Sequence, residues 1–195
     1  MPQSHNKKLL VITVEEVLLV AATGGVKSEF KPDYEYDDGF TTYLIFLRPQ
    51  LRQFLDYCLA NFRVALWSEY SPAFVQDALQ RIFGENYDSG VFEFIWTADQ
   101  CVPPSDGRYI VEGYVHRHRC KSFDKIVEAG YLEDEIIIVD SNPKHWEPYC
   151  ELPEESWVFA GSICKMFGNI AINDKCYSPD DTSLLDVMEK LADKT

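Results

Sequence analysis

The sequence predicts an α/β fold in which a mostly parallel sheet is covered by helices on both faces. Largely apolar segments over 9–12, 62–67 and 135–140 are typical of strands that are buried on both sides. Between them lie segments whose apolar residues recur at helical spacing. Strands that alternate with helices in this way favour a parallel sheet, and ligands of such sheets bind beyond the carboxyl ends of the strands.

The chain of 195 residues is long enough for one domain, and we treat 1–195 as that domain. We expect a loop over 21–40 and a hairpin insertion over 97–120, with no large additional domain. The other expected elements are, in order, a strand over 43–47, a helix with Pro49 at its first position, a helix from Ser71-Pro72 to Gly84, a strand over 91–96, a helix over 121–129, a strand over 157–160 and a helix opened by Ser178-Pro179.

Composition limits the classes of partner and compartment. The net charge of −14 and the pI of about 4.6 disfavour binding to nucleic acid, whereas they are compatible with a basic protein partner. No run of about 18 apolar residues is present, so we expect no membrane-spanning helix. The first residues lack the apolar core of a signal peptide, and the six cysteines form no Cys-x-x-Cys pair. We therefore expect an intracellular, cytoplasmic protein with free thiols.

Polar residues follow three of the expected strands at the same edge of the sheet. Thr13 and Glu15 follow the first strand, Ser68 follows the second, and Asp140 ends the strand over 135–140. Because parallel strands end at a common edge, we expect these four side chains to converge and to form the candidate site.

The order and spacing of these segments resemble the haloacid-dehalogenase superfamily, which has a Rossmann-like fold. The closer resemblance is to its small phosphatases of the RNA-polymerase C-terminal-domain type, also called the NLI-interacting-factor-like family. It covers about 7–191, and the segments that carry it are 7–11, 46–55, 62–68, 135–143 and 178–185.

The resemblance implies phosphoryl transfer through a strand-end Asp-x-Asp-x-Thr motif with bound magnesium. In this chain Thr13 stands at the nucleophile position, Glu15 at the acid/base position and Val17 at the threonine position. The phosphate-binding serine and lysine correspond to Ser68 and Lys121.

The final motif of the family, two acids followed by Ser/Thr-Pro, reads Asp140-Ser141-Asn142-Pro143 here. Thr13 and Ser141 each remove an acid near the metal, and magnesium requires anionic oxygen ligands. We therefore expect no cofactor, with magnesium only if the chain is an active enzyme. A threonine is also a much weaker nucleophile than a carboxylate unless a base activates it.

Three functions remain open. The first is a catalytically impaired phosphatase-like protein that binds a phosphorylated ligand or a protein partner, either phosphorylated or basic. The second is an active but atypical phosphatase that uses Thr13, Glu15 and Asp140, and the third is a scaffold whose old site binds nothing. Simpler interpretations also apply to single positions: Thr13 and Val17 as filler, Ser68 as a turn cap, Lys121 as a solvated lysine, and 140–143 as a plain turn.

One feature is independent of the resemblance. His116, His118 and Cys120 alternate along an expected strand, so their side chains share a face, and Cys101 lies on the expected partner strand. Histidine and cysteine are zinc ligands, but a spacing of two residues is uncommon in structural zinc motifs. A polar hairpin face is the alternative that we favour.

Overall fold

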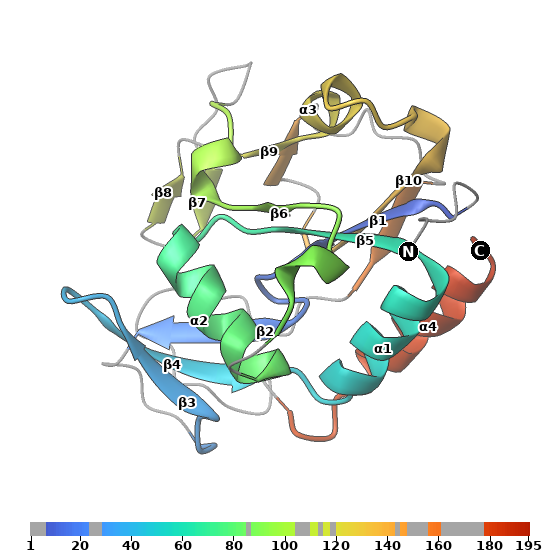
Figure 1. Ribbon diagram of the computed structural model, residues 1–195. Coiled ribbons are helices and arrows are strands. Elements are labelled where there is room, and N and C mark those ends of the chain that lie inside the picture. Colours follow the sequence, from blue (N-terminus) through green and yellow to red (C-terminus); the bar gives the residue numbers. More distant parts are fainter. Residues whose placement is uncertain are drawn as a thin grey trace.

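The structure is a computed structural model that describes residues 7–23, 29–84, 87–103, 110–112, 115–117, 120–142, 145–147, 156–160 and 178–195. Its centre is a parallel sheet with the strand order β12-β10-β1-β5-β6 (Figure 1). These strands are β12 (Trp157–Phe159), β10 (Ile136–Asp140), β1 (Leu9–Thr13), β5 (Arg63–Trp67) and β6 (Ile95–Trp96). The prediction of an α/β fold built on a mostly parallel sheet is confirmed.

Helices cover both faces of this sheet (Figure 1). They are α1 (Leu51–Asn61), α2 (Pro72–Phe83) and α4 (Ser183–Ala192) on one side and α3 (Phe123–Glu128) on the other. Residues of β1 alternate between the two sides, because Leu10 and Ile12 pack in the core with the three longer helices, whereas Leu9 and Val11 pack with Phe123. The strand is therefore buried on both faces, as its continuous apolar run predicts.

A second, antiparallel sheet has the order β2-β4-β3, with β2 (Leu19–Thr23), β4 (Thr42–Leu47) and β3 (Tyr34–Asp37). The prediction of a loop over 21–40 is wrong over 21–23 and 34–37, which belong to β2 and β3. Tyr34 and Tyr36 alternate with exposed Glu35 and Asp37, and Tyr36 meets the Phe74 ring edge-on at 5.0 Å. This two-residue alternation is the strand signal within an otherwise polar segment.

Several predicted boundaries shift. The strand predicted over 91–96 is shorter than expected: Val91 belongs to the 3₁₀ turn η1 (Ser89–Val91), and β6 consists of Ile95–Trp96. Helix α1 begins at Leu51 after Gln50 in a left-handed conformation, so Pro49 is outside the helix. The helix predicted from 121 begins at Phe123, because β9 (Lys121–Ser122) pairs with β11 (Trp146–Glu147). The last helix begins at Ser183.

The segment over 97–120 contains the expected hairpin, formed by β7 (Ile110–Glu112) and β8 (Val115–Arg117). An antiparallel bridge between Val102 and Cys120 closes its base. The remaining short helices are η2 (Ala98–Gln100) and η3 (Glu133–Glu135). No helix in the described part of the chain is both long and apolar enough to cross a membrane.

Candidate functional site

The carboxyl ends of β1 and β10 bring Thr13 against Asp140. The two strands are parallel neighbours with Ile12 opposite Val139, so the residues that follow end at the same level. The Thr13 hydroxyl donates to Asp140 Oδ2 at 2.5 Å, and both side chains are buried. The expected convergence of these strand ends is therefore present in the structure.

Asp140 has donors on both carboxylate oxygens. Oδ2 accepts from Thr13, from Trp146 Nε1 at 2.7 Å and from Lys121 Nζ at 3.4 Å, while Oδ1 accepts from the Asn142 amide at 2.9 Å. Burial acts to raise the pKa of Asp140, but Lys121, His145 and the two side-chain hydrogen bonds outweigh it and hold the pKa below its usual value. Asp140 is thus an ionised carboxylate with donors on both of its oxygens.

Lys121 supplies the positive charge of this group. Its side chain is fully buried, because β9 pairs with β11 and places Lys121 opposite Trp146. Its ammonium lies 3.3 Å from Glu69 Oε1 and 3.4 Å from Asp140 Oδ2. The interpretation of Lys121 as a solvated surface lysine is therefore wrong.

The two carboxylate oxygens of Glu15 differ in their hydrogen bonding. Its Oε1 accepts from the Ser68 hydroxyl at 2.5 Å, from the Tyr70 amide at 3.2 Å and from the Glu69 amide. Its Oε2 is buried and has no hydrogen-bond partner among the described residues. Ser68 does act partly as a turn cap, since its Oγ accepts from the Tyr70 amide at 3.0 Å.

The turn after β1 is held by contacts to distant segments. Ser141 donates to Glu16 Oε2 at 2.8 Å, and Glu16 has a left-handed backbone with φ of 59°. Arg48 Nη1 donates to the Glu16 carbonyl at 2.8 Å. Val17 is fully buried in the core, which agrees with its interpretation as an apolar filler.

Several members of the site were not predicted from the sequence. Glu69 bridges the Lys121 ammonium and His145, whose Nδ1 lies 3.4 Å from Glu69 Oε1, while Trp146 donates directly to Asp140. The available signal was position alone: Glu69 follows Ser68 directly, and His145 and Trp146 follow the turn that begins at Asp140.

The charges of the described site residues are unequal. Glu15, Glu69 and Asp140 contribute three carboxylates, against the single ammonium of Lys121. Because these side chains are buried, the electrostatic interactions between them are stronger than they would be in water. The two side chains expected to hold a phosphate, Ser68 and Lys121, each already donate to a carboxylate.

The residues considered as zinc ligands, for which we favour a polar hairpin face, are only partly described. His118 lies outside the described residues, and of His116 the structure gives the backbone in β8. Cys101 and Cys120 are buried free thiols. Within the described residues, no group of three or more histidine, cysteine or acidic side chains is arranged to hold a metal ion.

Comparison with known proteins identifies relatives of the fold. Residues 8–162 match the model of the family described as NLI interacting factor-like phosphatase. No curated protein was found to match the sequence. One similar solved structure is Fcp1, described as an essential RNA polymerase II CTD phosphatase, with 10% identity and a TM-score of 0.59. Another is fission yeast Fcp1 bound to beryllium fluoride, with 11% identity and a TM-score of 0.52.

Each alignment covers 96% of this chain, but 62% of the first Fcp1 chain and 50% of the second. The chain therefore spans about half to three-fifths of the length of these relatives. At this identity the likeness shows the fold alone.

Proposed function

Because the chain belongs to the NLI interacting factor-like phosphatase family, we propose that it is a catalytically impaired phosphatase-like protein that acts through binding to another protein. Its old active site is then a structural cluster inside an interaction domain. The observation that carries this proposal is the position of Thr13, whose hydroxyl donates its hydrogen bond to Asp140.

Thr13 lacks the two features that hydrolysis requires. An alcohol becomes a good nucleophile only when a base removes its proton, and the acceptor here is Asp140, whose lowered pKa makes it a weak base. Glu15 is held by Ser68 and by two backbone amides, so it too is bound within the protein. If Thr13 were phosphorylated, the product would be a stable ester, unlike the reactive anhydride that an aspartate forms.

The side-chain oxygens at the site also do not suit magnesium, which prefers about six oxygen ligands, several of them anionic. Asp140 Oδ2 already accepts from three groups, one of which is the Lys121 ammonium. Ser141 supplies a hydroxyl that donates to Glu16. We therefore include the absence of a bound metal cofactor in the proposal and derive no step through magnesium.

The partner that we propose is a basic protein. The net charge of −14 and the excess of carboxylates at the site both support a cationic partner over an anionic one.

The compartment that we propose is the cytoplasm. Buried free thiols at Cys58, Cys101 and Cys120 support a reducing, cytoplasmic compartment.

Weak phosphate binding is the second candidate function. It is favoured because Ser68 and Lys121, the two side chains that hold the phosphoryl group in the family, lie at the same carboxylate cluster. Phosphate would need to displace Glu15 from Ser68, so the expected affinity is millimolar at best. NMR titration with inorganic phosphate tests this: saturable shifts at Ser68 that vanish in Ser68→Ala support it, and their absence in the wild type rejects it.

Hydrolysis is tested with a generic aryl phosphate and magnesium. We expect no turnover above background from the wild-type protein, and none from Asp140→Ala. If the wild-type protein hydrolyses the ester and the activity disappears in Glu15→Ala and Asp140→Ala, the chain is an active, atypical phosphatase and the main proposal is wrong.

A further inference from the structure

The hairpin of β3 and β4 carries an aromatic side chain that the core does not use. Phe40 lies in the loop between the two strands and is 98% exposed, the highest value among the exposed large apolar residues that the structure describes. Figure 1 shows the hairpin tip reaching to the left beyond the neighbouring helix α2. Burial of a phenylalanine is strongly favourable, so a fully exposed one is available for a partner.

The loop holds Phe40 in a defined place. Asp38 accepts from the Phe40 and Thr41 amides at 2.9 and 2.7 Å, and Asp37 accepts from the Gly39 amide at 2.7 Å. Gly39 has a φ of 87°, which suits a residue without a Cβ. Because these bonds order the loop before binding, little conformational freedom is lost when Phe40 is covered.

The loop end of the hairpin is fixed to the body by aromatic contacts, because Tyr43 lies one residue into β4. The Tyr43 ring lies 6.0 Å from Phe74 of α2 and 6.3 Å from Tyr70. Tyr70 in turn donates its amide to Glu15 at the candidate site. The hairpin is therefore a rigid projection of the domain.

Strand β3 is also available for pairing. It is the edge strand of its sheet, and among the described residues β4 is its one neighbour. An edge strand presents unpaired backbone donors and acceptors that a second extended chain can bind.

Charge determines which chain fits. Asp33, Glu35, Asp37 and Asp38 are all exposed, and the sequence has no lysine or arginine from 32 to 47. A second copy of this chain would place like charges together, and nucleic acid and anionic membranes would also be repelled. A segment rich in lysine or arginine would be attracted.

We propose that the β3–β4 hairpin is a docking site for an extended, basic segment of another protein. The segment pairs with the edge of β3, its cations face Glu35 and the neighbouring aspartates, and an apolar side chain beyond the end of β3 covers Phe40. This assignment rests on the proposed binding function and names the surface and the chemistry of the partner.

The test uses the full chain and a labelled peptide of about twelve residues that alternates lysine with valine, long enough to span β3 and the loop when extended. Fluorescence anisotropy should show saturable binding, and NMR should shift amides over 33–41. Phe40→Ala should weaken binding about tenfold, as expected for loss of a central aromatic anchor. Glu35→Lys should weaken it by a similar factor.

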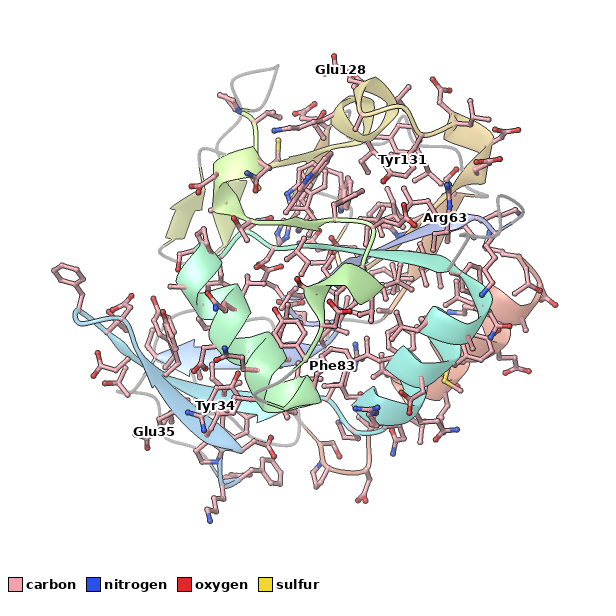
Figure 2. The ribbon with its side chains drawn as sticks, in the orientation of Figure 1. Tyr34, Glu35, Arg63, Phe83, Glu128 and Tyr131 are labelled. Atoms are coloured by element: carbon pink, nitrogen blue, oxygen red, sulfur yellow. The ribbon has the colours of Figure 1, made fainter. Side chains whose placement is uncertain are left out.

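Matched controls separate the hairpin from general effects. Leu132→Ala removes another exposed apolar side chain, 61% accessible, and should leave binding unchanged. Glu128→Lys makes the same charge change on α3, at the end of the molecule opposite Glu35 in Figure 2, and should alter binding less than twofold. A peptide that alternates lysine with glycine should bind at least tenfold more weakly, since it lacks strand propensity and apolar contacts.

Four outcomes overturn the proposal: no binding of the lysine–valine peptide, equal binding by Phe40→Ala, equal binding of the glycine peptide, or equal effects of Glu35→Lys and Glu128→Lys. Self-association in sedimentation that disappears in Phe40→Ala would instead assign the hairpin to a second copy of this chain. Phosphatase activity would reject the proposed function but leave these binding results intact, so the two failures are distinguishable.

Discussion

Two carboxylates at the same edge of the central sheet are held in opposite ways. Asp140, at the end of β10, has donors on both oxygens and shares Oδ2 with a buried ammonium. Glu15, just after β1, receives three donors on one oxygen and, within the part of the chain that the structure describes, none on the other. Asp140 is therefore a fixed structural anion, whereas the Glu15 carboxylate retains a buried, unused acceptor.

The difference follows from the side chains that surround each acid. Around Asp140 the chain places three side-chain donors, from Thr13, Lys121 and Trp146. Around Glu15 the donors belong mainly to the turn after β5, which can reach one oxygen only. With Thr13 beside Asp140, the ends of β1 and β10 contribute a donor and an acceptor in place of two acids.

The largest effect is expected from Lys121→Met, which removes the ammonium between Asp140 and Glu69 while it keeps an apolar side chain of similar length. Removal of one partner from a buried ionic group leaves the other charges unpaired, so we expect a loss of about 3–5 kcal/mol in the free energy of unfolding. Urea denaturation followed by fluorescence measures this loss. Lys190→Met, at an exposed position in α4, is the control and should change stability by less than about 0.5 kcal/mol. A loss below about 1 kcal/mol at Lys121 would show that the cluster contributes little.

The second effect concerns pH. Because the folded pKa of Asp140 is below its unfolded value of about 3.9, its contribution to stability is complete above that pH and is lost as pH falls through the folded pKa. Asp140→Asn should lower stability by about 2 kcal/mol at neutral pH, since its new amide NH₂ must face a donor and the charge paired with Lys121 is lost. The stability of this variant should also depend less on pH below about 4. Denaturation curves from pH 7 down to pH 3 would refute this if both proteins lost stability in parallel.

The smallest effect is expected from Glu15→Gln. The amide oxygen can still accept the three hydrogen bonds of Oε1, and the oxygen that becomes an amino group has no partner to lose. We expect the free energy of unfolding to change by less than about 1 kcal/mol. Thermal denaturation of Glu15→Gln and Asp140→Asn under the same conditions compares the two acids directly. A loss at Glu15 as large as that at Asp140 would mean that the two acids are held equally.

The sequence predicted the parts of the fold whose signal is local. Continuous apolar runs identify β1, β5 and β10, and Ser71 caps α2 as expected, its hydroxyl accepting from the Phe74 amide at 3.4 Å. The prediction failed over 21–40, because the polar residues and glycines of that segment obscured the short alternation of Tyr34 and Tyr36.

The sequence predicts which strand ends come together at the site, but not the hydrogen bonds and ion pairs that join its side chains. Parallel strands that end together bring Thr13 and Asp140 into contact, which the order of the strands implies. The burial of Lys121 depends on the pairing of β9 with β11, two short strands without a periodic signal. The partnership of Glu69 with Lys121 is a tertiary contact between residues 52 apart, and no local pattern indicates it.

Arg48 has a consequence for the order in which the molecule is assembled. Its guanidinium donates to the Glu16 carbonyl, to the Ala160 carbonyl and to Asp181, which are 32, 112 and 133 residues away in the chain. Contacts across such long separations form late, because the loops that they close are large. During synthesis the turn that follows β1 emerges well before Ala160 and Asp181 do. The residues of the turn after β1 are therefore made early, but the contacts of Arg48 that hold this turn are completed only after Ala160 and Asp181 have been made.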